Sequence, residues 1–198
     1  MDNAQAESLR VGVRRAYSVA AEQPWEDHPF PVGAQFARSL GYSQALLSIL
    51  PSISVETFSG VSNVSIFADI PAGSCVLDLG CGAGLDSLIA ARRSGPNGRV
   101  IGVDFSEAML RRARRAAEFP GGENLEFCQA DGESLPLDAG SVDVALANGI
   151  FNLNPGRRYI FQELSRVMCS GGVVYAAELI LKEPLPREIR ESEENWFA

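Results

Sequence analysis

The stretch VLDLGCGAG, at residues 76–84, is followed by RVIGVD at residues 99–104. Each begins with a short apolar run, which is typical of a buried strand. The first run ends in a loop with three glycines, and the second ends in a carboxylate. Between them, apolar side chains recur at helical spacing over residues 85–93. The two stretches therefore predict a strand, a tight turn, a helix and a second parallel strand, which together bind a nucleoside.

The size and composition are those of an ordinary domain. The chain has 198 residues, of which 46% are hydrophobic and 21% charged, as in a typical soluble globular protein. No apolar run approaches the roughly 20 residues that a membrane helix needs. The N-terminus lacks the basic and then apolar pattern of a signal peptide. We therefore expect a cytoplasmic protein that does not bind a membrane.

Charge and metal-ligand spacing argue against two further classes of function. The net charge is −8, whereas nucleic-acid binding depends on Lys and Arg that neutralise phosphates. The four cysteines form no Cys-x-x-Cys pair, and His28 is the single histidine. This spacing predicts no metal site, and we expect no nucleic-acid partner.

The chain divides into three predicted parts. Residues 1–70 read as a helical and loop cap, residues 71–183 as the nucleoside-binding core, and residues 184–198 as a short helix or tail. In the core, strands alternate with helices, and the predicted strands are 75–79, 100–103, 125–129, 142–147 and 173–181. Such alternation predicts an α/β, Rossmann-like, doubly wound and mainly parallel sheet. Its ligand should lie beyond the carboxyl ends of the strands.

The glycine spacing indicates which nucleoside is bound. The dinucleotide fingerprint is Gly-x-Gly-x-x-Gly, and Gly80 and Gly82 match its first two positions. Leu85 stands at the third, and Gly84 comes one residue early. Asp78, just before the loop, would repel a pyrophosphate and attract an amino group or a sulfonium. The pattern favours S-adenosylmethionine over NAD.

These residues resemble the class I S-adenosylmethionine-dependent methyltransferases. Residues 78–84 resemble motif I of that family. The resemblance implies that Asp104 holds both ribose hydroxyls, that Asp131 accepts from the adenine amino group, and that Met109 packs on adenine. The expected cofactor-binding residues are Ser62, Asn63, Asp78, Gly80, Cys81, Gly82, Gly84, Asp104, Phe105, Met109, Asp131, Gly132 and Asn148.

Four further segments resemble the arsenite methyltransferase branch: GVSN at 60–63, SLIAARR at 87–93, GRVIGVD at 98–104 and NGIFNL at 148–153. Enzymes of that branch hold arsenic through thiolates, one of them in the segment after the fourth strand. Gly149 stands at that position, and no cysteine precedes Cys75. The resemblance therefore carries over the cofactor site and not the arsenic site.

The C-terminal part departs from the family pattern. Class I enzymes add an antiparallel hairpin beside the fifth strand, whereas residues 184–198 leave room for one helix. A missing hairpin exposes a sheet edge, which proteins usually pair or cover. We therefore expect a homodimer, or a cover provided by the N-terminal segment.

Methyl transfer needs positioning more than a nucleophilic residue, so the catalytic residues stay unknown. The weak candidates are Tyr17, His28, Asn148 and Asn152. The favoured function is methyl transfer from S-adenosylmethionine to a small-molecule acceptor. Three alternatives stay open: a non-catalytic S-adenosylmethionine-binding module, a metalloid methyltransferase with atypical thiols, and an NAD-linked oxidoreductase.

Overall fold

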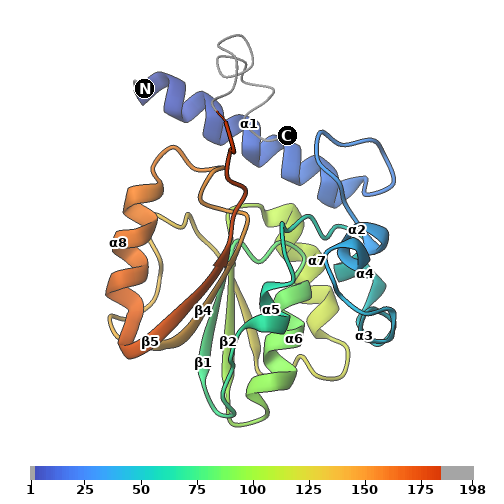
Figure 1. Cartoon of the computed structure of the whole chain (residues 1–198), viewed down its shortest axis with the longest axis vertical. Helices are drawn as coiled ribbons and strands as arrows, with labels where there is room; N and C mark the ends of the chain where they lie inside the picture. Colours follow the sequence, from blue (N-terminus) through green and yellow to red (C-terminus); the bar gives the residue numbers. More distant parts are fainter. Residues whose placement is uncertain (1–2, 184–198) are drawn as a thin grey trace.

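The computed structural model describes residues 3–183, which fold around a five-stranded sheet (Figure 1). All the strand pairs are parallel, in the order β3-β2-β1-β4-β5. The strands are β1 (Cys75–Leu79), β2 (Arg99–Asp104), β3 (Leu125–Gln129), β4 (Val142–Asn148) and β5 (Met168–Ala177). The strand order changes direction between β1 and β4, which places a ligand crevice at their carboxyl ends. The predicted Rossmann-like α/β fold is confirmed.

Helices precede the sheet and then connect its strands. Those before the sheet are α1 (Asn3–Glu22), α2 (Ala34–Ser39), α3 (Gln44–Ser48), α4 (Ser52–Val55) and α5 (Val64–Phe67). Those between strands are α6 (Leu85–Ser94), α7 (Glu107–Ala117) and α8 (Arg157–Val167). The hydroxyl of Ser106 accepts a hydrogen bond from the Met109 amide and so caps the start of α7.

The strand side chains build a core on both faces of the sheet. Leu77 and Leu79 of β1 pack in one cluster with Ile160 of α8. Val76 points to the opposite face and packs in another cluster with Ala90 of α6. All five side chains are at most 2% exposed. This two-sided burial explains why the inner strands β1, β2 and β4 are mostly apolar and do not alternate.

The last strand differs from the prediction of 173–181. It begins at Met168, directly after α8, and includes Gly171 and Gly172. A bulge between Val142 and Val144 of β4 accommodates these extra residues. The strand ends at Ala177, which lies opposite Asn148, the last residue of its partner β4.

The expected cover of the β5 edge by the N-terminal segment is not found in residues 3–183. Helix α1 instead crosses the carboxyl ends of the strands (Figure 1). Only α5 of the described N-terminal helices reaches β5 closely, through an edge contact of Phe67 with Tyr175 at 6.3 Å between ring centroids. None of the helices in the described range is long and apolar enough to cross a membrane.

Candidate cofactor site

The turn after β1 forms a glycine-lined cradle. Gly80 and Gly82 have φ angles of 73° and 53°, in the left-handed region that favours glycine. The amides of Gly80 and Cys81 donate to the Val103 carbonyl at 2.8 and 3.0 Å, which fixes the turn against β2. A Cβ atom at Gly80 would lie 2.3 Å from Cγ2 of Ile150. Only glycine therefore allows this close approach of the two loops.

Asp104 links the cradle to the turn after β2. One carboxylate oxygen accepts from the Gly82 amide at 2.9 Å, and the other accepts from the Ser106 amide at 2.8 Å. The side chain is buried, and burial raises the pKa of Asp104 to about 6, against the lowering effect of these amide hydrogen bonds. The carboxylate is thus held in one orientation at the mouth of the site.

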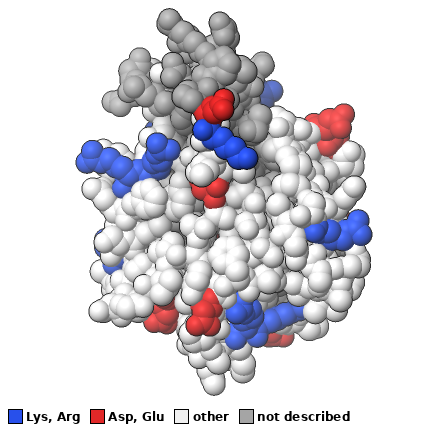
Figure 2. Space-filling model, viewed as in Figure 1, with Lys and Arg blue, Asp and Glu red and all other residues white. Residues whose placement is uncertain are grey.

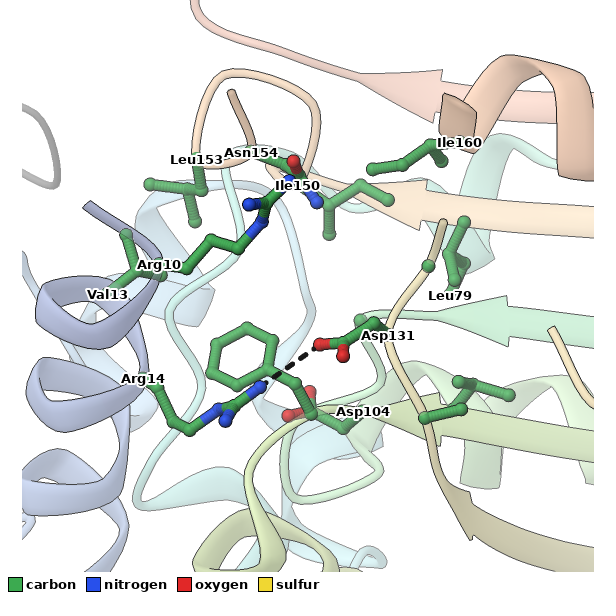
Figure 3. Close-up of a pocket in the computed structure, with 15 residues that line it drawn as sticks. Arg10, Val13, Arg14, Leu79, Asp104, Asp131, Ile150, Leu153, Asn154 and Ile160 are labelled. Atoms are coloured by element: carbon green, nitrogen blue, oxygen red, sulfur yellow. Dashed lines mark hydrogen bonds and ion pairs between the residues drawn. The ribbon is translucent and has the colours of Figure 1, made fainter. Parts of the chain in front are cut away.

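Two adjoining cavities lie at the carboxyl ends of the strands. Cavity 1 and cavity 2 hold about 620 and 650 Å³ of empty space, which includes space open to solvent. Figure 3 looks into cavity 1, with Asp104 and Asp131 projecting from the core and Arg10 and Arg14 from α1. Both cavities share the wall formed by Gly80, Asp104, Phe105, Ile150 and Leu153. Together they form one groove that runs across the glycine cradle.

Most of the predicted cofactor residues face this groove. Besides the shared wall, Asp131 and Gly132 line cavity 1. The predicted residues that line cavity 2 are Asp78, Cys81, Gly82, Met109 and Asn148. Ser62, Asn63 and Gly84 line neither cavity. Gly84 instead precedes α6 in a left-handed conformation, with φ of 83°.

Three buried carboxylates surround cavity 2. Asp78, Asp86 and Asp104 are 2%, 6% and 7% exposed. Burial, reinforced by repulsion from Asp86, raises the pKa of Asp78 to about 8, and burial also raises the pKa of Asp86. In the part of the chain that the structure describes, no ion pair involves any of the three. Burial without a counter-ion thus favours the protonated form of these carboxyl groups, and a cationic ligand would favour the ionised form, so this cavity fits a cationic ligand.

Asp86 is a site residue that sequence analysis missed. It accepts hydrogen bonds from the hydroxyls of Tyr42 and Ser65 and, at 2.9 Å, from Nδ2 of Asn148. Burial and the nearby Asp86 raise the pKa of Tyr42, so its hydroxyl stays a donor. Asp86 lies in the first turn of α6, where an acidic side chain is favourable in any helix, so the local sequence gives little sign of its role.

Asn148 connects β4 to the N-terminal segment. Its Oδ1 accepts from the amides of Val61 and Ser62 at 2.8 and 3.1 Å. Its Nδ2 donates to the Ser62 carbonyl at 2.7 Å as well as to Asp86. Both ends of this amide are engaged inside the protein, although the side chain also lines cavity 2. Whether it orients an acceptor stays a prediction.

The two aromatic candidates lie at different distances from the groove. Tyr17 of α1 lines cavity 2, stacks on Phe30 at 4.5 Å and meets Phe105 edge-on at 6.4 Å. Burial raises the pKa of Tyr17, so the hydroxyl stays protonated. His28 stacks on Phe30 at 6.1 Å, and its Nε2 lies 3.0 Å from the Gln23 carbonyl oxygen. His28 lines neither cavity.

Asn152 also lies outside both cavities. Its Nδ2 donates to the Leu179 carbonyl at 2.5 Å, and its backbone amide donates to Glu178 at 3.1 Å. These contacts tie the loop after β4 to the segment after β5. The side chain therefore supports the loop after β4, which forms part of the groove wall, but does not face the groove itself.

The place where the family resemblance puts a thiolate is apolar here. A Cβ atom at Gly149 would lie 3.0 Å from Cγ1 of Val61, so the two residues face each other. Cys81 lines cavity 2, but burial raises the pKa of its thiol well above the usual value. The other cysteines, Cys75, Cys128 and Cys169, line neither cavity. Among residues 3–183, no three His, Cys, Asp or Glu side chains are grouped to hold a metal.

Comparisons with known proteins agree with this geometry. A family model described as a methyltransferase domain matches residues 70–197. The arsenite methyltransferase of Halobacterium salinarum is 37% identical over 131 residues, which cover 66% of this chain and 34% of that protein. The demethylmenaquinone methyltransferase of Lactococcus lactis is 36% identical over 106 residues, covering 54% and 42%.

A solved structure gives the same result. An arsenic(III) S-adenosylmethionine methyltransferase from Chlamydomonas reinhardtii superposes with a TM-score of 0.69 and 30% identity, covering 78% of this chain and 56% of that one. The chain thus spans about a third of the length of the curated arsenite methyltransferases that it matches. The matched region contains the glycine cradle, Asp104 and Asp131, and the chain belongs to the methyltransferase-domain family, with the fold of the class I S-adenosylmethionine-dependent methyltransferases.

Proposed function

We propose that this chain binds S-adenosylmethionine along the groove formed by cavities 1 and 2 and transfers its methyl group to a small-molecule acceptor. The observation that carries the proposal is the set of three buried carboxylates, Asp78, Asp86 and Asp104, around cavity 2 without an ion-pair partner in residues 3–183. A ligand with an ammonium and a sulfonium would supply a counter-charge that favours the ionised form of these groups.

S-adenosylmethionine supplies a methyl group already activated on a sulfonium sulfur, for in-line displacement by the acceptor. The chain's own residues then have to orient the two partners and exclude water. Asp104 is placed to hold the ribose hydroxyls, and Asp131 to accept from the adenine amino group. Asp78, beneath the glycine cradle, complements the positive charge of the methionine half. Ile150 and Leu153 form the apolar wall over the cradle.

We place the acceptor beside the wall of cavity 2 that the N-terminal segment forms, which is called the outer wall below. This wall comes from the N-terminal segment and carries hydroxyl and aromatic groups: Ser54, Thr57, Phe58 and Ser59. Thr57 Oγ1 is buried and has no hydrogen-bond partner within the described residues. Arsenic(III) prefers thiolate ligands, and the facing residues Gly149 and Val61 carry no thiol. The wall therefore supports an organic acceptor over a metalloid.

Of the candidate catalytic residues, Tyr17 and Asn148 line cavity 2. Tyr17 stays protonated because burial raises its pKa, so it can donate a hydrogen bond and does not act as a base. His28 and Asn152 lie outside the groove. An acceptor that needs no proton removed at the site is the simplest match to this lining.

The test has two stages. Isothermal titration should show binding of S-adenosylmethionine and S-adenosylhomocysteine, with NAD as the control ligand. Formation of S-adenosylhomocysteine is then followed with a panel of acceptors. The panel includes quinol-type aromatics and arsenite, because relatives are named for demethylmenaquinone and arsenite.

Each outcome of these two stages has a definite meaning. Turnover with an organic acceptor supports the proposal. Turnover with arsenite alone would favour the metalloid alternative. Binding of the cofactor without turnover across a broad panel would favour a non-catalytic module, and binding of NAD alone would support an oxidoreductase.

We also propose that two copies of the chain pair through β5. This edge strand, MCSGGVVYAA, contains no charged residue, and Val173 and Val174 are 46% and 39% exposed. Phe67 of the adjacent α5 is 50% exposed. Figure 2 shows the middle of this face largely uncharged, with most Lys, Arg, Asp and Glu near the rim. Within residues 3–183 this edge is uncharged and pairs with no further strand, and such an edge favours pairing with another strand.

The oligomeric state is tested by light scattering of the purified chain. We expect the mass of a dimer, and Val174→Lys should convert it to a monomer because a charge on the edge opposes strand pairing. A monomeric mass for the unaltered chain would contradict the dimer. The expected cytoplasmic location stays a prediction, which cell fractionation tests.

A further inference from the structure

Helix α1 forms the roof of cavity 1. It crosses the carboxyl ends of the strands (Figure 1) and contributes Arg10, Val13 and Arg14 to the cavity lining (Figure 3). Its apolar face is buried, with Leu9 and Val13 at 4% and 3% exposed and Ala20 fully buried. This packing holds the helix in place and directs the side chains of Arg10 and Arg14 toward the cavity.

The guanidinium of Arg14 uses the groups that adenine is expected to use. Its Nη2 lies 3.1 Å from Oδ1 of Asp131, the predicted acceptor of the adenine amino group. Its central carbon lies 5.8 Å from the ring centroid of Phe105, another predicted cofactor residue. A guanidinium and an adenine are both flat, and both present N–H donors at their edge. Figure 3 shows Arg14 reaching across the cavity toward Asp131.

Arg10 makes a different kind of contact. It donates through Nη2 to Glu133 at 2.8 Å and through Nε to the same oxygen at 3.2 Å. Glu133 lines neither cavity, so this pair does not compete with a ligand. The Arg10–Glu133 pair can therefore keep α1 docked while Arg14 changes position.

We propose that Arg14 occupies the adenine subsite of the ligand-free protein and competes with the cofactor for Asp131. Binding then exchanges the Arg14–Asp131 ion pair for the contact between Asp131 and the adenine amino group, and α1 stays in place. Arg14 thereby lowers the affinity for adenosyl ligands. This inference rests on the proposed function, because it requires the cofactor to bind in cavity 1.

The expected effect is moderate because the ion pair is partly solvated. The side chains of Arg14 and Asp131 are 52% and 59% exposed. Exposed pairs of this kind are weak, so removing Arg14 should tighten adenosyl-ligand binding by about two- to fivefold. The pair is also screened by salt. The affinity of the unaltered protein should therefore approach that of the variant as ionic strength rises.

The experiment compares Arg14→Ala with Arg15→Ala by calorimetric titration of S-adenosylhomocysteine. Arg15→Ala removes the same charge from the same helix, but Arg15 lines neither cavity, so it controls for the change in charge alone. We expect Arg14→Ala to bind more tightly than both the unaltered protein and the control. Weaker binding would mean that Arg14 stacks on adenine as a clamp, and equal binding would remove Arg14 from the subsite. Either result overturns the proposal.

A second pair of variants checks that Asp131 is the group competed for. In an Asp131→Ala background, Arg14→Ala should produce no tightening; the same tightening there would contradict direct competition. Arg14→Gln, compared by circular dichroism, verifies that any change is not a loss of the helix. If no variant and not even the unaltered chain binds S-adenosylhomocysteine, the proposed function itself fails. That outcome is distinct from binding whose affinity is the same with and without Arg14.

Discussion

Replacing Asp78 by asparagine should make the ligand-free protein more stable at alkaline pH. Burial, together with repulsion from Asp86, raises the pKa of Asp78 from 3.8 to about 8, while a hydrogen bond from Ser87 opposes the rise. The folded state therefore holds the proton more tightly than the unfolded state does. Stability from this group is fully present below about pH 3.8 and is lost as the pH rises toward 8.

The size of the effect follows from that shift. A rise of about four pKa units corresponds to about 6 kcal/mol, at about 1.4 kcal/mol per unit. Part of it belongs to the pair Asp78–Asp86, since removing one charge relieves the other as well. We therefore expect Asp78→Asn to raise the free energy of unfolding at pH 8.5 by about 2 kcal/mol or more. At pH 5, the variant and the unaltered protein should differ much less.

Urea unfolding of the ligand-free protein at pH 5 and pH 8.5 measures this difference. Asp69→Asn is the matched control, because Asp69 is exposed and lines neither cavity. If the stability of Asp78→Asn fell with pH as steeply as that of the control, Asp78 would not be the buried titrating group. The proposal that cavity 2 binds a cationic ligand would then lose its main support.

Three further predictions follow from the same contacts. Asp104→Ala should weaken S-adenosylhomocysteine binding by about 1–3 kcal/mol, because ribose hydroxyls and two backbone amides lose their acceptor; unchanged affinity in titration would refute the ribose assignment. Tyr42→Phe removes a donor from buried Asp86 and should lower the free energy of unfolding by about 1–3 kcal/mol, with an unaltered urea midpoint as the contrary result. Gly80→Ala would place a Cβ 2.3 Å from Ile150 at a positive φ, and should cost about 2 kcal/mol or more in the same assay; a variant as stable as the parent would contradict the close packing.

The regular part of the fold was predictable because local pattern and tertiary structure agree there. The bounds of β1 and β3 are as predicted, and Ser106 caps α7 as its side chain suggests. The start of β5 was not predictable, because Gly171 and Gly172 normally end an element. Here a bulge against β4 absorbs them within the strand. That depends on the partner strand and leaves no mark in the local sequence.

The candidate site divides in the same way. Asp78 and Asp104 were predicted because each lies in the last two residues of a recognisable strand, next to the glycine cradle. Asp86 was missed, since its donors Tyr42 and Asn148 lie 44 and 62 residues away along the chain. Arg14 was missed for a similar reason, as it reaches Asp131 across 117 residues. Contacts of such sequence separation arise only once the sheet and α1 have assembled.

With the acceptor placed as proposed, its recognition comes largely from a part of the chain that precedes the matched domain. The methyltransferase-domain match begins at residue 70, whereas the outer wall of cavity 2, including Thr57, precedes it. Asn148 and Asp86 join the two parts, because they bind the Val61–Ser62 backbone and Tyr42 of the N-terminal segment. On this proposal, likeness in the core indicates a shared methyl donor and leaves the choice of acceptor to the N-terminal segment. A change of acceptor should follow from substitutions in residues 54–61, with the affinity for adenosyl ligands nearly unchanged.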